Sequence, residues 1–205
     1  MSKHLSQILT KHFPIEAYAS LKDVINTFNF SFKVTRDRVS KLGDFRVVFG
    51  QKPTITVNGT LNPYSFLITF LHEFAHLAVY QEFGVKVKPH GYEWKSVFQE
   101  YLLITIKENL FPDDLLEEIL LFTNNPKAST SACPTLMKAL ARYDERVSSE
   151  GVLYLDDIGL GELFVFRKEL YRKIEKRRTR VMCERVLDKR RYTISGHAEV
   201  NVPEY

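Results

Sequence analysis

Apolar residues recur at three- and four-residue steps along residues 14–28. The residues with this spacing are Ile15, Tyr18, Leu21, Ile25 and Phe28. Because such positions fall on one face of an α-helix, they predict an amphipathic helix. Three shorter runs rich in valine, phenylalanine, isoleucine and threonine follow at residues 30–34, 45–49 and 54–57, separated by turn signals. These runs predict a three-stranded antiparallel sheet.

The longest apolar-periodic stretch begins at Asn62 or Pro63 and continues to about Phe83, and Gly84 follows it as a stop signal. This pattern predicts the longest helix of the chain. Three further helices are predicted from proline and aspartate signals at their ends, over residues 92–109, 115–122 and 134–146. The predicted fold class is therefore α+β, with the three-stranded sheet packed on the longest helix.

The chain changes character after residue 147. Residues 148–161 are rich in glycine and serine, which predicts a linker. From residue 162 onward, apolar residues alternate with a period of two in several short runs, and this predicts a small β module. The predicted organisation is a first domain over residues 1–147, the linker, and a β module over residues 162–205.

The composition is that of a soluble globular protein. Of the 205 residues, 44% are hydrophobic and 26% are charged, which excludes collagen-like, disordered and coiled-coil proteins. No apolar run approaches the roughly 18 residues that a transmembrane helix needs, and the N-terminus has no apolar signal core. Two cysteines cannot build a disulfide framework, so a reducing cytoplasm is the expected location.

The sequence His72-Glu73-Phe74-Ala75-His76 lies inside the longest predicted helix. At about 100° per residue the two histidines lie about 40° apart and one turn from each other, so both imidazoles can reach one metal ion. Glu73 projects close enough to touch a metal-bound water without being a ligand. Zinc lowers the pKa of such a water to near 7, and a carboxylate can then take its proton. The pattern predicts one Zn²⁺ on His72 and His76, with Glu73 as the catalytic base of peptide hydrolysis.

A catalytic zinc needs a third protein ligand and an open fourth position. His90 lies in a predicted turn just before the next helix, where the loop can fold it back over the first two histidines. Glu93 and Glu100 are alternatives, and either would give a site of two histidines and one glutamate. The group that stabilises the oxyanion stays open among four residues: Tyr92, Tyr101, Tyr154 and Arg142.

Two segments of the chain resemble the SprT-like family: HEFAHLAVYQEFG at residues 72–84 and HGYEWKSVFQEY at residues 90–101. The mark of that family is HExxH followed by a histidine that opens an HGxxW/F-type helix. The turn at residues 42–44 and the strand at residues 55–58 are also similar to that family. The resemblance covers residues 15–110.

This resemblance implies a zincin-like metallopeptidase core that holds one zinc ion. By position in the motif, His72, His76 and His90 are the implied ligands and Glu73 is the implied catalytic base. The family includes Spartan, a DNA-dependent protease that removes proteins crosslinked to DNA. The resemblance therefore also implies a protein substrate associated with DNA.

Many SprT-like proteins carry a C-terminal zinc ribbon, and the tail of this chain resembles one in position and composition. The paired cysteines are missing, because Cys133 and Cys183 are fifty residues apart and His197 adds at most one donor. A structural zinc site requires four ligands. We therefore expect no second zinc, and we expect Cys183 to be a buried apolar residue.

The tail is also basic. Residues 162–205 hold 12 lysines and arginines against 7 aspartates and glutamates, whereas residues 1–161 hold 17 against 18. If residues 176–183 form one strand, Lys176, Arg178 and Arg180 line one face and could follow a nucleic-acid backbone. A solvated basic face is the alternative.

The predicted function is that of a zinc metallopeptidase whose protein substrates are associated with DNA. DNA would bind through the basic tail and place the protein on the nucleoid. The alternative is a nucleic-acid-binding module whose zinc site is structural or vestigial.

Overall fold

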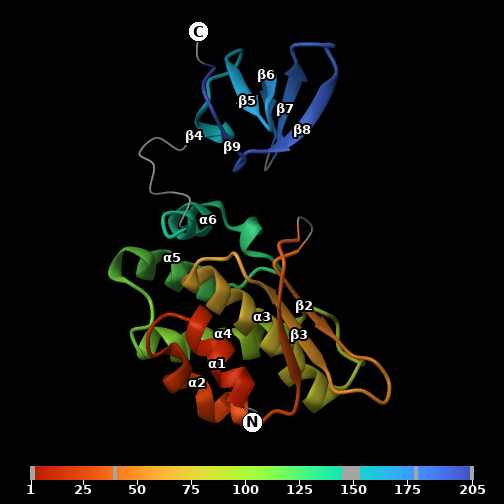
Figure 1. Cartoon of the computed structure of the whole chain (residues 1–205), viewed down its shortest axis with the longest axis vertical. Coiled ribbons are helices and arrows are strands. Elements are labelled where there is room, and N and C mark those ends of the chain that lie inside the picture. The colour runs from red at the N-terminus through yellow and green to blue at the C-terminus, as the bar shows by residue number, and fades with distance from the viewer. Residues whose placement is uncertain (1–2, 39–40, 145–152, 178–179, 204–205) are drawn as a thin grey trace. The chain divides into compact units, whose positions relative to one another are not determined.

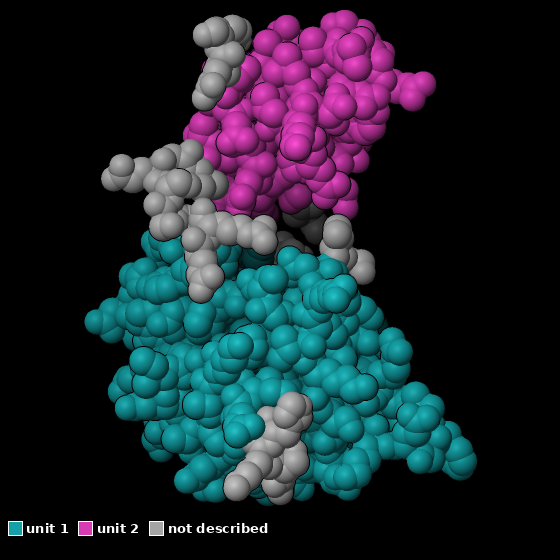
Figure 2. Space-filling model, in the orientation of Figure 1, with its two compact units in different colours: residues 1–145 teal, residues 146–205 magenta. Residues whose placement is uncertain are grey.

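A computed structural model describes residues 3–38, 41–144, 153–177 and 180–203. The contacts between residues divide the chain into two compact units, unit 1 over residues 1–145 and unit 2 over residues 146–205 (Figure 2). Each unit has its own hydrophobic core. No described helix combines the length and the apolar character that crossing a membrane requires.

Unit 1 combines helices with one small sheet (Figure 1). In chain order its elements are α1 (Lys3–His12), α2 (Ala17–Asn26), β1 (Ser31–Thr35), β2 (Gly43–Arg46), β3 (Thr54–Asn58), α3 (Pro63–Phe83), α4 (Tyr92–Lys107), α5 (Asp113–Asn124), η1 (Thr130–Ala132) and α6 (Pro134–Ala141). The α+β class and the three-stranded sheet are therefore as predicted.

The direction of one strand differs from the prediction. The strand order is β1-β3-β2, so β3 lies in the middle. β2 pairs with β3 in the antiparallel sense, with Phe45 opposite Ile55, but β1 pairs with β3 in parallel, with Phe32 also opposite Ile55. The prediction of a wholly antiparallel sheet is wrong because β2, the next strand along the chain, does not pair with β1 but forms the opposite edge of the sheet. β3 then returns between the two and runs in the direction of β1.

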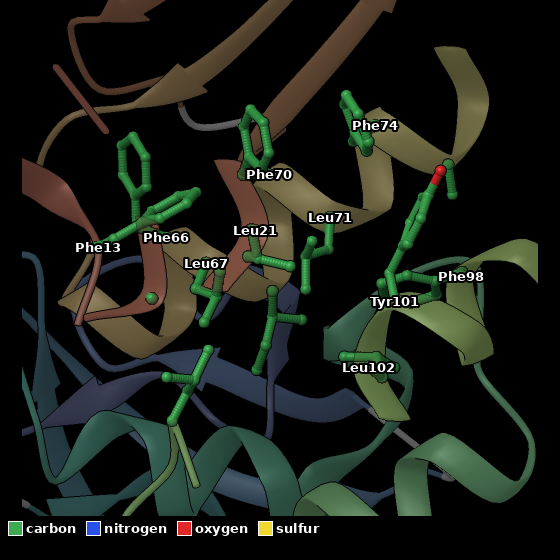
Figure 3. Close-up of a cluster of buried hydrophobic side chains, with 14 of the residues drawn as sticks. Phe13, Leu21, Phe66, Leu67, Phe70, Leu71, Phe74, Phe98, Tyr101 and Leu102 are labelled. Carbon is green, nitrogen blue, oxygen red and sulfur yellow. The ribbon is translucent and has the colours of Figure 1, made fainter. Parts of the chain in front are cut away.

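The motif helix α3 is the centre of unit 1. Its start is fixed by Asn62, whose side chain accepts a hydrogen bond from the Ser65 N–H at 2.9 Å, and it ends at Gly84, where φ is 67°. Eleven of its residues are buried, because the sheet covers one side and helices cover the others. Figure 3 shows Phe66, Phe70 and Phe74 along this helix, packed with residues of neighbouring elements.

Helix α1 is absent from the sequence-based prediction. Leu5, Leu9 and Phe13 lie four residues apart and are all buried in the core of unit 1. Phe13 packs edge-on against Phe70 at 5.2 Å between ring centroids. The charged residues between these positions hid a helical period that was present in the sequence.

Unit 2 is a small β module, as the period-two pattern predicts. Its elements are β4 (Leu153–Tyr154), η3 (Leu155–Asp157), β5 (Leu163–Phe166), β6 (Glu169–Lys176), β7 (Arg180–Arg185), β8 (Arg191–Ser195) and β9 (Glu199–Val200). Strands β5, β6, β7 and β8 form one antiparallel sheet in that order, and β4 pairs with β9.

The predicted linker, residues 148–161, lies outside the described residues as far as residue 152. Its second half belongs to unit 2, because Leu155 and Ile158 are buried in the core of that unit. Lys173 fixes this segment: its Nζ donates hydrogen bonds to the carbonyl oxygens of Leu155, Asp156 and Ile158 at 2.6–3.3 Å. The glycine and serine content was misleading because the apolar residues between those positions determine the packing.

Candidate metal centre

Two elements of unit 1 bring three histidines together. His72 and His76 lie one turn apart on α3, and His90 lies in the turn that precedes α4. His90 has a φ of 57°, in the left-handed region. The next residue must be small, because a Cβ on Gly91 would lie 2.8 Å from the carbonyl oxygen of Lys88. This tight turn directs the His90 ring back toward α3.

The Nε2 atoms of the three rings converge. The Nε2 atoms of His76 and His90 are 3.0 Å apart, those of His90 and His72 are 3.2 Å apart, and the three ligand atoms lie within 4.8 Å of one another. A tetrahedral zinc ion with Zn–N bonds of 2.0–2.1 Å requires N···N separations of about 3.4 Å. The donor set and its spacing therefore fit one zinc ion. Within the described part of the chain, neither Glu93 nor Glu100 joins this cluster.

The environment keeps these imidazoles neutral. Burial, helped by the neighbouring His76 and His90, lowers the pKa of His72 to about 3. Burial and His90 lower the pKa of His76 to about 4, and burial also lowers the pKa of His90. A neutral ring nitrogen is the form that binds a metal, so no proton has to leave these rings at pH 7.

Glu73 lies beside the triad and is held by β2. Its side chain is buried, and this burial, with the charge of Asp44 as the second cause, raises its pKa to about 8. The backbone N–H of Phe45 donates a hydrogen bond to the Glu73 carboxylate. A Cβ on Gly43 would lie only 2.6 Å from Oε1 of Glu73, so the absence of a side chain at Gly43 lets the strand lie directly against this carboxylate.

These residues open into one cleft of about 520 Å³ in unit 1. His72, Glu73, His76 and His90 all line it. The remaining lining residues come from β2 and the residues just before it, the first half of α3, the turn before α4, and η1 with the loop before it: Lys41, Leu42, Gly43, Asp44, Phe45, Ile68, Thr69, Pro89, Ala128, Ser129 and Thr130. The cleft therefore has space for a ligand directly over the three ring nitrogens.

Comparison with known proteins gives the same segment. The model of the SprT-like family matches residues 46–107, a range that contains all three histidines and Glu73. This segment is SprT-like, as the sequence predicts. Protein SprT of Pasteurella multocida (strain Pm70) is 62% identical over 34 residues, which cover 17% of this chain and 20% of that protein. Protein SprT of Actinobacillus succinogenes (strain ATCC 55618 / DSM 22257 / CCUG 43843 / 130Z) is 51% identical over 55 residues, 25% of this chain and 32% of that protein.

The chain thus spans about a fifth to a third of the length of these curated relatives. No solved structure matches it. Both named relatives are called Protein SprT, which agrees with the family whose model matches residues 46–107.

Some contributors to the SprT-like site were not predicted from the sequence. Gly43 and the backbone of Phe45 position Glu73, and Thr69 lines the cleft one turn before it. No local sequence pattern indicates these contacts, because β2 lies against α3 only once the sheet has formed. Trp94, four residues after His90 and on the first turn of α4, was predicted only as part of the family motif.

The three candidates for oxyanion stabilisation that belong to unit 1 are among the described residues and do not line the cleft. Tyr92 is exposed on the outside of α4, whereas Tyr101 is buried in the core. Arg142 forms an ion pair with Asp114 at 3.0 Å, and Tyr154 belongs to unit 2.

The basic residues of unit 2 are arranged differently from the prediction. β6 ends at Lys176 and β7 begins at Arg180, and the Arg177 N–H donates to the Arg180 carbonyl at 2.7 Å. Lys176 lies opposite Val181, while Arg180 lies opposite Ser195, so these two cations do not share one face of one strand. Arg178 lies outside the described residues. The prediction of a single strand was wrong because residues 177–179 include no glycine, proline or asparagine to mark the end of β6.

The cysteines do not form a cluster among the described residues. Cys183 is buried in the core of unit 2, as predicted, and burial raises its pKa to about 11. Cys133 precedes α6 and is half-buried. That unit 2 is a zinc ribbon without its cysteines stays a prediction.

Proposed function

We propose that this chain is a zinc-dependent peptidase of the SprT-like type, which hydrolyses peptide bonds in proteins. The observation that supports this proposal is the convergence of three neutral imidazole nitrogens in one cleft with a buried carboxylate beside them. Sites of this kind hold a catalytic zinc with an open position. The proposal includes one Zn²⁺ per chain.

The residues of the cleft would have separate roles in metal binding and proton transfer. His72, His76 and His90 would hold the ion through their Nε2 atoms. When bound, zinc supplies Lewis acidity, polarising a carbonyl and lowering the pKa of a water molecule to near 7. Glu73, whose ionised form the positive charge of a bound ion favours, would accept a proton from the attacking water and return it to the leaving amide nitrogen. The Phe45 N–H holds the Glu73 carboxylate in place for both transfers.

The strand beside the cleft favours a polypeptide as the substrate. β2 is an edge strand of the described sheet. The Asn58 N–H donates to the Leu42 carbonyl, so the alternation of an antiparallel ladder turns the backbone groups of Leu42 and Asp44 toward β3 and those of Gly43 and Phe45 toward the cleft. An extended peptide can pair with such an edge as an additional strand. It would then lie across the three histidines.

The decisive experiment replaces Glu73 by Gln. This change keeps the shape of the side chain and removes the proton acceptor, so zinc content should stay at one per chain while cleavage of an unfolded protein substrate falls by at least about a hundredfold. Glu82→Gln, an exposed change on the same helix, is the matched control and should retain full turnover. Cleavage that survives in the Glu73→Gln protein would refute the proposed role.

A second function, nucleic-acid binding by unit 2, is supported by the cations at the turn between β6 and β7. Lys176, Arg177 and Arg180 all lie at this turn and are exposed. We propose that the turn contacts the backbone of DNA, so that the peptidase acts on DNA-associated proteins. If instead the site of unit 1 is vestigial, this binding would be the whole function.

A salt titration of single-stranded DNA binding tests this second function. Changing these three residues together to Ser should lower the slope of log K against log salt concentration by about 2, since each phosphate contact contributes about 0.7 for a single strand. An unchanged slope would mean that the cations only solvate the module. Removal of zinc with a chelator should abolish cleavage and leave this binding intact.

A further inference from the structure

Trp94 is the one tryptophan of the chain, and it lies against all three histidines. It is on the first turn of α4 and is only 1% exposed. The centroid of its ring is 4.6 Å from that of His72, 5.3 Å from that of His76 and 4.7 Å from that of His90. A single buried side chain thus forms a common wall for residues from two separate elements.

A hydrogen bond fixes this wall to one of the ligands. The indole Nε1–H donates to the backbone carbonyl of His72 at 3.3 Å, which joins α4 to α3 at the ligand itself. Side chains on a helix lean toward its N-terminus, and His90 precedes that end of α4 by two residues. The indole is therefore held between the pair on α3 and the ring that comes from the turn.

The three rings need such a support. His90 is reached through a turn with a left-handed φ, and its ring meets the other two only if the turn stays folded over α3. A site whose ligands are already in place loses less conformational freedom when it binds an ion, and its affinity is higher for that reason. Groups that orient metal ligands typically change metal affinity by tenfold to a hundredfold when removed.

We propose that Trp94 is a positioning residue that preorganises His72, His76 and His90 for one metal ion. It does not bind the ion, and it acts through the orientation of the three imidazoles. This inference rests on the proposed function, because it takes zinc to be the ligand of the triad. It goes further in assigning the affinity of the site to an apolar contact and not to the histidines alone.

The competing interpretation is that Trp94 only fills the core. Both interpretations expect a less stable protein when the indole is removed, so stability does not separate them. They differ in zinc affinity among proteins that are still folded. Phe66→Leu supplies the matched control, because Phe66 is also a fully buried aromatic residue and it packs against His12, Phe13 and Phe32.

The experiment measures the zinc dissociation constant of the full chain by competition with a chelator. Trp94→Leu should weaken zinc binding by about tenfold to a hundredfold. Trp94→Phe keeps a ring against the imidazoles and should lose less than about tenfold, whereas Phe66→Leu should bind zinc like the wild type. Circular dichroism establishes that each protein is folded before titration.

The visible spectrum of bound Co²⁺ gives an independent measurement, because it reports coordination geometry. It should change in the Trp94→Leu protein and stay constant in the Phe66→Leu protein. Equal zinc affinity and equal spectra in wild type and Trp94→Leu would overturn this inference alone. A wild-type protein that binds zinc but cleaves nothing would overturn the peptidase proposal and leave this one standing, and a wild type that binds no zinc would overturn both.

Discussion

Both units of this protein bury polar groups among apolar side chains, but they do so with opposite results. In unit 2, Lys173 is 3% exposed and its ammonium donates hydrogen bonds to three backbone carbonyls. In unit 1, three imidazole nitrogens converge, and the Nε2 atom of His90 lies 3.0 Å from that of His76 and 3.2 Å from that of His72. An ammonium has three donors, so the hydrogen-bonding capacity of Lys173 is satisfied without a ligand. The converging lone pairs of the three imidazoles are satisfied only when a cation lies between them.

This difference separates a polar group that stabilises the fold from a polar group that serves a ligand. A satisfied buried network rigidifies its surroundings, and removing it should cost stability. A cluster of like acceptors contributes little to stability until an ion is added, and removing one member should cost affinity. Removing the buried polar group should therefore lower stability in unit 2 and metal affinity in unit 1.

The largest effect is expected for His90→Ala. Loss of one of three ligands should weaken zinc binding by at least about a thousandfold, because the two remaining histidines cannot complete the site. The stability of the zinc-free protein should change by less than about 1 kcal/mol. Chelator competition and denaturant unfolding measure the two quantities. His12→Ala removes a histidine outside the cluster and should leave zinc affinity unaltered; if it does not, the binding measured is unspecific.

Lys173→Met should show the reverse pattern. Methionine keeps much of the volume and removes the donors, so three carbonyls lose their partner, at about 1–3 kcal/mol for each that stays buried. We expect the unfolding transition of unit 2 to lose about 4 kcal/mol, with zinc affinity unchanged. Lys189→Met, an exposed change in the same unit, is the control and should stay within about 0.5 kcal/mol. A Lys173→Met protein as stable as this control would show that the comparison of the two units is wrong.

A smaller effect is expected at the strand that holds Glu73. In Gly43→Ala the new Cβ would meet Oε1 of Glu73 at 2.6 Å, so the carboxylate must move. A displacement of this size should lower turnover by about tenfold to a hundredfold and leave zinc content at one per chain. Gly50→Ala serves as control, since its φ of 75° strains an alanine while nothing lies within 4 Å of the new Cβ. Equal turnover in the Gly43→Ala and Gly50→Ala proteins would contradict a positioning role for β2.

Local periodicity was enough to find the elements that carry the site. The helical period placed His72 and His76 on α3, and the turn before α4 placed His90 near them. The remaining errors concern information that is not local. Whether β1 pairs in parallel depends on where the intervening chain travels, and the contact of Gly43 with Glu73 exists only after that sheet has formed.

The errors in unit 2 have a similar origin. Leu155 and Ile158 lie in the core of unit 2, and Lys173 of β6 donates hydrogen bonds to their carbonyl oxygens. No pattern within the predicted linker contains that partner. Residues 177–179 include no glycine, proline or asparagine, so no local signal marks where β6 ends and β7 begins. Short-range patterns therefore predict which residues alternate but not where the strands reverse.

The smallest expected effect is the pH dependence of the zinc-free protein, in which the triad and Glu73 oppose each other. The pKa of His72 and His76 is lowered in the folded state to about 3 and about 4, so the unfolded chain binds protons first, and stability is lost as pH falls below about 6.5. The pKa of Glu73 is raised to about 8, so the folded state binds the proton there and stability is lost as pH rises from about 4.5 to 8. Unit 1 should therefore be most stable near pH 6.5 and lose about 1–2 kcal/mol by pH 8.

Thermal unfolding of wild type and Glu73→Gln across this pH range measures the effect. The Glu73→Gln protein should not lose stability above pH 6.5 and should still lose it below pH 6.5. If the stability of the wild type does not change from pH 6.5 to 8, Glu73 is not a buried carboxyl with a raised pKa.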